Sequence, residues 1–108
     1  MVKIGVSLLP EHTSVGALRA AWRAADALGA DSLWIWDHFF PVTGDPDGAS
    51  FECWTLVAAM AADTTTATVG SLVSACGYRN PDLLADMVCT VDHVSGGRAV
   101  PKSYPYSR

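Results

Sequence analysis

The sequence predicts an α/β domain in which strands and helices alternate in the order β-α-β-α-β-α-β. Near the start, apolar and polar residues alternate with a period of two, which is typical of a strand. Three later stretches repeat apolar residues every three or four positions, which is typical of helices packed on one face. Strands joined through helices form a parallel sheet. This pattern fits both an open, doubly wound sheet and part of an eight-stranded barrel.

The first strand is expected between Val2 and Leu8, and Pro10 ends it. Thr13 or Ser14 can cap the helix that follows, because a hydroxyl accepts a hydrogen bond from the first free amides. Gly29 suits the position after this helix. The apolar face of the helix consists of Val15, Leu18, Trp22, Ala25 and Leu28.

The second strand is expected at Ser32 to Trp36, with both tryptophans on one of its faces. The stretch 41–49 is rich in glycine, proline and aspartate, and predicts a loop. Ser50 is expected to cap the second helix. The apolar face of that helix consists of Trp54, Val57 and Ala61, with Met60 beside it.

A third strand is expected from Ala67 to Ala75, where small and β-branched residues are frequent. Asn80 followed by Pro81 predicts a helix start, since proline is favoured at the first helical position. The helix continues through apolar residues at helical spacing until Gly96-Gly97 ends it. A fourth strand begins at 98–100.

Composition narrows the classes of function. The chain has 108 residues, half of them hydrophobic, and a net charge of −4 without a basic run, which argues against binding to nucleic acid or to an anionic membrane. No apolar run approaches the roughly 20 residues of a membrane span, and the N-terminus lacks a signal-peptide pattern. Three widely spaced cysteines favour reduced, buried thiols in a cytoplasmic protein: Cys53, Cys76 and Cys89.

Asp37 and His38 are the first candidates for chemistry. They follow the second strand directly, and burying such groups is costly unless they are paired or used. In parallel α/β folds, active sites lie at the carboxyl ends of the strands. An imidazole there can serve as a donor or acid near neutral pH, and Asp37 can orient it or bind a polar ring edge. The alternative is structural: the aspartate caps the loop and the histidine is satisfied in the core.

Other polar residues carry weaker signals. Asp92-His93 closes the third helix at the opposite face, where helix termination and stability are the expected role. His12 follows the first strand and can border the same pocket as His38 or be solvated. Arg79 follows the third strand and can meet an anion or bridge neighbouring loops.

Several segments together resemble the bacterial luciferase-like monooxygenase family, closest to the branch that uses the deazaflavin coenzyme F420. The segments agree with the family in order and spacing and cover roughly residues 2 to 100. They are Gly29-Ala30-Asp31-Ser32-Leu33-Trp34-Ile35-Trp36-Asp37-His38, Val69-Gly70-Ser71-Leu72-Val73, Tyr78-Arg79-Asn80-Pro81 and Asp92-His93-Val94-Ser95-Gly96-Gly97-Arg98.

The resemblance implies the N-terminal portion of a (β/α)8 TIM barrel. It also implies hydride transfer between F420 and a small organic substrate, with an FMN-dependent monooxygenase as the nearest alternative. It places Asp37 and His38 beside the coenzyme ring as catalytic residues. A non-proline cis peptide is implied at Leu72-Val73, behind the ring. The residues implied to bind the coenzyme are Asp37, His38, Leu72, Val73, Ser74 and Cys76, with no metal ligand.

The resemblance ends near residue 100. The family-like domain is expected at 1–100, and 101–108 is a polar tail in which Pro101 interrupts the fourth strand. A complete barrel needs about 250 residues, so we expect a truncated portion, possible association through exposed sheet edges and doubtful activity alone. Two other functions stay open: a non-catalytic remnant, and an α/β binding module. The binding module would need its third strand at an outer edge and no cis peptide at Leu72-Val73.

Overall fold

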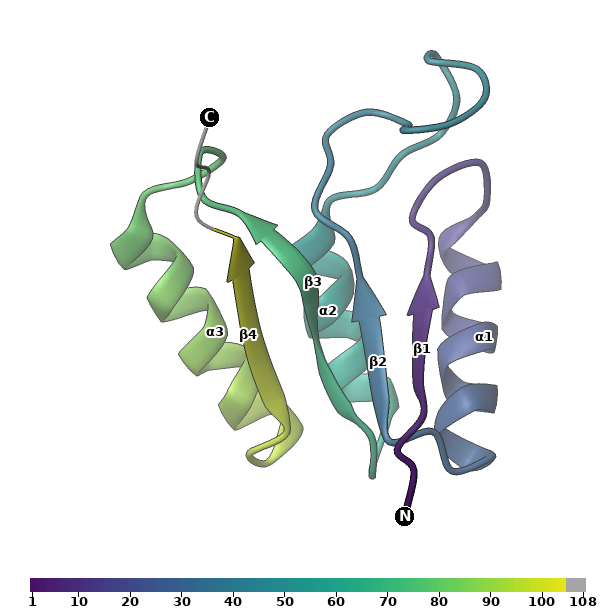
Figure 1. The fold of residues 1–108 in the computed structure, drawn as a ribbon, viewed down its shortest axis with the longest axis vertical. Coiled ribbons are helices and arrows are strands. Elements are labelled where there is room, and N and C mark those ends of the chain that lie inside the picture. The colour runs from purple at the N-terminus through teal and green to yellow at the C-terminus, as the bar shows by residue number, and fades with distance from the viewer. Residues whose placement is uncertain (105–108) are drawn as a thin grey trace.

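The computed structural model describes residues 1–104, with side chains through Lys102, and has the predicted alternating order (Figure 1). Its four strands form one parallel sheet in the order β1-β2-β3-β4. The elements are β1 (Gly5–Leu8), α1 (Val15–Ala27), β2 (Ser32–Ile35), α2 (Cys53–Asp63), β3 (Thr68–Ala75), α3 (Pro81–Ser95) and β4 (Ala99–Tyr104).

All three described helices lie on one side of the sheet (Figure 1). We call the other side, which no described helix covers, the open face. A doubly wound sheet carries helices on both faces and reverses its strand order, whereas a barrel keeps sequential strands with helices outside. The described part of the chain therefore has the arrangement of a barrel segment. None of its helices is long and apolar enough to cross a bilayer.

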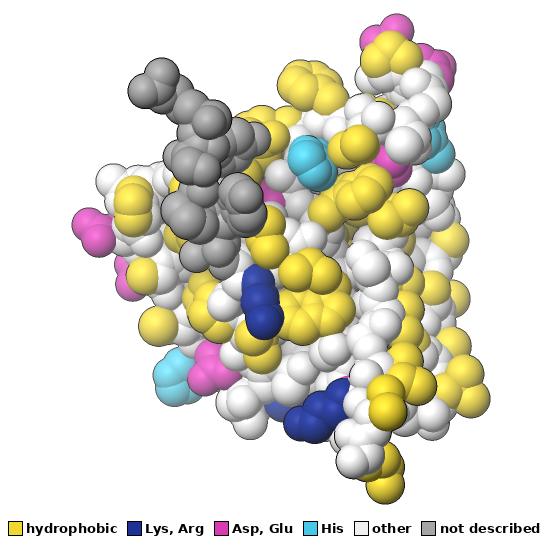
Figure 2. Space-filling view, in the orientation of Figure 1, with side chains coloured by type: hydrophobic (Ala, Val, Ile, Leu, Met, Phe, Trp, Pro, Cys, Tyr) yellow, Lys and Arg dark blue, Asp and Glu magenta, His cyan; other side chains and the backbone are white. Residues whose placement is uncertain are grey.

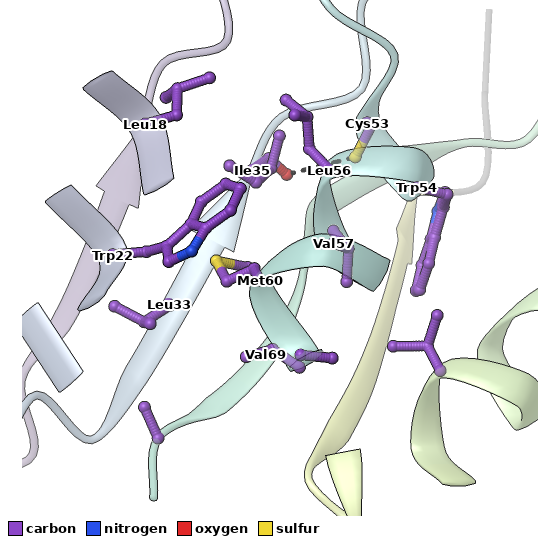
Figure 3. Close-up of a cluster of buried hydrophobic side chains, with 13 residues drawn as sticks. Leu18, Trp22, Leu33, Ile35, Cys53, Trp54, Leu56, Val57, Met60 and Val69 are labelled. Carbon is purple, nitrogen blue, oxygen red and sulfur yellow. Dashed lines mark hydrogen bonds between the residues drawn. The ribbon is translucent and has the colours of Figure 1, made fainter. Parts of the chain in front are cut away.

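The core lies between the sheet and the helices and is built around two tryptophans (Figure 3). Trp22 of α1 and Trp54 of α2 are 0% and 1% exposed, as the helical spacing predicted. Leu33 and Ile35 of β2 point into the same core and are fully buried. Each aromatic ring of this kind removes about 150–250 Å² from water, so these two side chains supply much of the burial that holds helices to sheet.

Most predicted helix ends are confirmed. The hydroxyl of Ser14 accepts from the Ala17 amide, and Asn80 caps α3 ahead of Pro81. Gly96 takes a left-handed conformation (φ 69°) after α3. Ser50 was expected to cap α2, and this prediction is wrong: Glu52 accepts from the amides of residues 54 and 55 instead, because the chain at Ser50 is held in a bridge to Glu11.

The prediction that Pro101 interrupts the fourth strand is also wrong. β4 continues to Tyr104, and Pro101 pairs with Ser71 just before a register shift between β3 and β4. The Arg98 carbonyl faces β3, where it accepts from the Val69 amide. Strand alternation then places the nitrogen of Pro101 at the outer edge, where a missing N–H costs no bond to β3. Residues 105–108 of the expected tail lie outside the described residues.

Trp34 covers much of the open face. A Cβ added to Gly5 would lie 3.0 Å from the indole Nε1, and one added to Gly70 would lie 3.1 Å from Cζ3. The indole therefore spans from β1 to β3 over two positions without side chains, and its Nε1 donates to the Ser32 hydroxyl at 2.8 Å. Figure 2 shows hydrophobic side chains grouped at the centre of this face.

Two expectations about burial differ from the structure. The first strand begins at Gly5 rather than Val2, and both Val2 and Ile4 are exposed. Of the three cysteines expected to be buried, Cys53 is, while Cys76 and Cys89 are exposed. Cys76 directly follows β3 and Cys89 lies in α3.

Candidate functional site

The candidate site lies at the carboxyl edge of β2 and β3, where their loops meet. Asp37 and His38 follow β2, and the β3–α3 loop brings Arg79 to the same place. The register pairs Ile35 with Ser71, so that Trp36 and Leu72, one residue further on, lie on neighbouring strands. The predicted residues are thus brought to one edge of the sheet, although their side chains point in different directions.

Asp37 is almost completely buried, with a side chain 1% exposed. Its Oδ2 accepts from the Ala75 amide at 2.8 Å and from Arg79 Nη1 at 2.6 Å. Its Oδ1 accepts from Arg79 Nη2 at 3.0 Å. Both carboxylate oxygens are therefore engaged within the protein, and they join the end of β2 to the end of β3.

Arg79 is held between two carboxylates. Besides Asp37, its Nη2 donates to Glu52 Oε2 at 3.1 Å, and its side chain is only 8% exposed. The hydrogen bonds to Asp37 raise the pKa of Arg79 against the opposing effect of burial. Of the two expectations for this arginine, the structure shows the bridge between loops. Bidentate pairing of this kind fixes geometry as well as charge.

His38 has the opposite character. It is exposed, and its ring meets the edge of Trp36 in a T-shaped contact with centroids 5.6 Å apart. It does not contact Asp37 through any hydrogen bond among the described residues. Trp34, Trp36 and His38 alternate along the chain on the open side of the sheet, so that the imidazole is accessible to a molecule bound there.

Aromatic side chains surround this edge. The rings of Phe39 and Tyr78 are stacked at 3.8 Å with 14° between their planes, joining the loops after β2 and β3. Phe39 is 51% exposed and Phe40 is 75% exposed. Exposed apolar groups gathered in one place commonly mark a binding surface. In Figure 2 a histidine lies among hydrophobic side chains at this end of the face.

The β3 residues named from the family resemblance divide between the two faces. The peptide Leu72-Val73 is cis, as predicted. Leu72 is 47% exposed and follows Gly70 on the open face. Ser74 is buried on the helix side and accepts from Trp54 Nε1 at 3.0 Å. Cys76 is exposed beyond the strand end. Leu72 thus faces the same side as His38 and Ser74 does not, while Val73, directly after the cis bond, is partly buried.

A groove of about 450 Å³ lies beside this edge, between α3 and the outer strands. Its walls are mostly apolar, and it includes the buried guanidinium of Arg79 at one end. It lies on the helix side of the sheet and thus opens away from the face that His38 occupies. The lining residues are Ser74, Cys76, Arg79, Pro81, Leu84, Ala85, Val88, Cys89, Pro101 and Lys102.

His12 binds the β2–α2 loop. Its Nε2 donates to the Thr43 carbonyl at 2.5 Å, and its ring leaves no room for a Cβ at Gly48. Glu11 accepts from the amide of Val42 and the hydroxyl of Thr43. The two residues therefore fix the long β2–α2 loop to the end of β1, which keeps that loop at the carboxyl edge.

Asp92-His93 lies at the other end of the sheet and has the structural role that was expected. The Asp92 carboxylate accepts from the Ala99 amide at 3.1 Å, and His93 is exposed in the last turn of α3.

Cys53 does not have the properties of a reactive cysteine. Burial raises the pKa of its thiol to about 12, which keeps it protonated.

The sequence profile of the luciferase-like monooxygenases matches residues 2–100. The chain belongs to this family. Its fold, four parallel strands with helices on one side, is the corresponding part of the luciferase-like TIM barrel.

Solved structures agree with this assignment. An F420-dependent secondary alcohol dehydrogenase in complex with an F420–acetone adduct has a TM-score of 0.84 at 22% identity, over 94% of this chain and 31% of its own. The coenzyme F420-dependent tetrahydromethanopterin reductase of Methanopyrus kandleri has a TM-score of 0.80 at 24% identity, over 94% and 26%.

A flavin enzyme is also similar. The oxygenating constituent of the Pseudomonas putida 3,6-diketocamphane monooxygenase, in complex with FMN, has a TM-score of 0.73 at 18% identity, over 98% of this chain and 30% of its own. The luciferase-like chain thus spans about a third or less of the structures it matches.

Sequence reasoning missed the role of Glu52 and left that of Arg79 open. A signal for the pairing was present: Asp37 and Arg79 carry opposite charges and follow two neighbouring parallel strands at the same edge. Glu52 gave no comparable signal, because it sits seventeen residues from the end of β2, and only the path of the intervening loop brings it to Arg79.

Proposed function

We propose that this chain carries the ring-binding half of an oxidoreductase site that transfers hydride between coenzyme F420 and a small organic substrate. The observation that carries the proposal is the accessible imidazole of His38, set on the open face at the carboxyl edge of β2. Two F420-dependent enzymes share the fold, which supports the choice of coenzyme.

The residues present fit the flat ring of such a coenzyme. Trp36 and Leu72 offer apolar surface on neighbouring strands, and His38 offers a hydrogen bond at its margin. This edge fits the charged tail of the coenzyme less well, because the positive charge of Arg79 is already paired with Asp37 and Glu52. Among the described residues, then, the site matches the ring rather than the phosphate-bearing part.

When bound, the deazaflavin supplies the hydride chemistry, and the protein supplies orientation and electrostatics. His38 would donate to, or accept from, an oxygen or nitrogen of the substrate or the ring edge. Trp36 would hold the imidazole through its edge contact. Asp37 would support the site from its buried side, because both of its carboxylate oxygens are already bonded to Ala75 and Arg79.

FMN is the second candidate coenzyme, favoured by the FMN complex among the similar folds. Its flat ring would use the same apolar surface. Titration of the purified chain with each coenzyme, followed by their own fluorescence, separates the two. We expect tighter binding of F420, and tighter binding of FMN would refute that choice.

Replacing His38 tests the site itself. We expect His38→Gln to weaken coenzyme binding about tenfold, which corresponds to one lost hydrogen bond of about 1.4 kcal/mol. His93→Gln is the matched control, because His93 is exposed at the opposite end of the sheet. Equal losses in the two variants would remove His38 from the site.

The alternatives to an enzyme make different predictions. A non-catalytic remnant would show no coenzyme affinity and would associate or melt without cooperativity, which sedimentation and circular dichroism can detect. The binding-module alternative required the third strand at an outer edge and no cis peptide at Leu72-Val73, and neither condition is met: β3 lies between β2 and β4, and that peptide is cis.

A further inference from the structure

His38 is poorly anchored for a residue that must meet a ligand. Among the described residues, its ring contacts Trp36 in a T-shaped arrangement, with the ring centroids 5.6 Å apart. The preceding residue is one of the most firmly held in the chain: Asp37 accepts from Ala75 and from two nitrogens of Arg79. The position of the imidazole therefore depends on how the backbone at Asp37 is held.

Arg79 supplies most of that constraint. Its two bonds to Asp37 are 2.6 and 3.0 Å, in a fork that fixes the carboxylate in plane and direction. Glu52 holds the guanidinium from the other side at 3.1 Å, and is itself fixed as the cap of α2 by the amides of Trp54 and Thr55. The chain of contacts thus runs from the start of α2 to the residue before His38.

Binding of an external anion is not the role that this geometry favours for Arg79. The guanidinium is 8% exposed and faces two carboxylates, so that the three groups together carry a formal charge of −1. An incoming phosphate or carboxylate would have to displace one of these partners. The same contacts suit an internal clamp that keeps the ends of β2 and β3 together.

We propose that Arg79 is a positioning residue: through Asp37 it sets where the His38 imidazole stands on the open face. The proposal rests on the proposed function only in naming His38 as the group that meets the coenzyme. The dependence of the His38 position on Arg79 does not require that function and can be measured without any coenzyme.

Nuclear magnetic resonance of the imidazoles provides the test, because the chain has only three histidines. In Arg79→Met we expect the ring signals of His38 to move toward those of an unstructured histidine, as the contact with Trp36 is lost. The signals of His93, at the other end of the sheet, should stay in place. Arg79→Lys keeps the charge but not the fork, and should restore the His38 signals only in part.

Arg23→Met is the control for general destabilisation, since Arg23 pairs with Asp63 far from the site. It should leave the His38 signals unchanged. Asp37→Asn and Glu52→Gln are milder changes in the same cluster, and they provide folded samples if Arg79→Met does not fold. Unchanged His38 signals in the folded variants would overturn the proposal, as would loss of folding in all of them, which would assign the cluster to stability alone.

A coenzyme titration of the same samples separates the two proposals. If the unmodified chain binds neither F420 nor FMN while His38 still moves in Arg79→Met, the proposed function fails and the positioning role stands. If the coenzyme binds and Arg79→Met neither moves His38 nor weakens binding more than Arg23→Met does, the positioning role fails alone. We expect Arg79→Met to weaken binding about as much as His38→Gln.

Discussion

The two ends of the sheet use charged side chains in different ways. At the amino ends of the strands, charged groups bind backbone: Arg98 donates five hydrogen bonds, four of them to carbonyls of residues 61, 64, 67 and 95. Asp26 accepts from the amides of residues 65 to 67. At the carboxyl ends, Asp37, Arg79 and Glu52 form an ion-paired cluster in addition to the bonds of the two carboxylates to backbone amides.

The exposed groups differ as well. The carboxyl end carries an accessible imidazole and the exposed rings of Phe39 and Phe40, the first of them stacked on the half-buried Tyr78. At the amino end, Arg98 and Asp26 bind backbone groups, whereas Arg19 and Arg23 pair with Asp63 and stay about half exposed. Asp-His pairs occur at both ends, so the position in the fold, rather than the residue types, separates His38 from His93. The two ends therefore differ in their exposed aromatic side chains, while buried or partly buried charged contacts occur at both.

The largest effect should come from Arg98. We expect Arg98→Met to lower the free energy of unfolding by about 3–4 kcal/mol, because several carbonyls lose their partner in a partly buried position. Urea unfolding measures this. Arg23→Met, which loses a single exposed contact to Asp63, should cost less than about 1 kcal/mol. Similar losses in the two variants would show that the backbone contacts of Arg98 contribute no more than an exposed ion pair.

An intermediate effect is expected in acid. The pKa of Asp63 is lowered well below its ordinary value, first by the hydrogen bond from Arg19 and then, against burial, by Trp22 and Arg23. The folded state therefore binds this proton more weakly than the unfolded state. The stabilisation is present above about pH 4 and is lost as the pH falls toward the lower, folded pKa.

Thermal melts between pH 6 and pH 2 measure this loss. Asp63→Asn should be less stable at pH 6 and should lose less on acidification than the unmodified chain. Asp47→Asn, in the exposed β2–α2 loop, serves as control and should keep the unmodified slope. An unchanged acid slope in Asp63→Asn would show that this contact contributes little.

The smallest effect on stability is expected at the exposed rings. Phe40→Ser should change the free energy of unfolding by less than about 0.5 kcal/mol, because the side chain is 75% exposed. It should reduce self-association in sedimentation velocity, since Phe40 lies among other exposed apolar groups. Leu28→Ser is the counterpart at the amino end, 88% exposed, and should reduce association less.

Much of the fold could be predicted from the sequence because local signals agree with the tertiary structure. The caps at Ser14 and Asn80, and the buried faces carrying Trp22 and Trp54, follow from spacing and side-chain chemistry alone. Predictions failed where a segment distant in the sequence determines the local structure. Ser50 is drawn into a bridge with Glu11, so that capping falls to Glu52, and Pro101 is accommodated because β4 lies at an edge.

The site was predictable in location but not in detail. The order of strands and helices places Asp37 and His38 at the carboxyl edge. Which of the two stays accessible depends on Arg79 and Glu52, whose approach is set by loop paths. Alternation along the chain puts Asp37 and His38 on opposite sides, and the buried side is the one that meets the arginine. The family resemblance named both residues, while the structure gives them unequal exposure.

Trp34 limits the size of the side chains that two neighbouring strands can carry beside it. The indole fills the space that side chains at positions 5 and 70 would occupy, and a Cβ at Gly70 would also meet the Val100 carbonyl. A larger residue at Gly5 therefore needs a smaller residue at position 34 and a shift of the Ser32 hydroxyl, whereas at Gly70 the Val100 carbonyl would block a side chain whatever residue stands at 34. Among homologous chains, we expect position 70 to stay glycine and positions 5 and 34 to vary together, so that paired changes across β1 and β2 would record this layer of packing in the evolutionary history of the family.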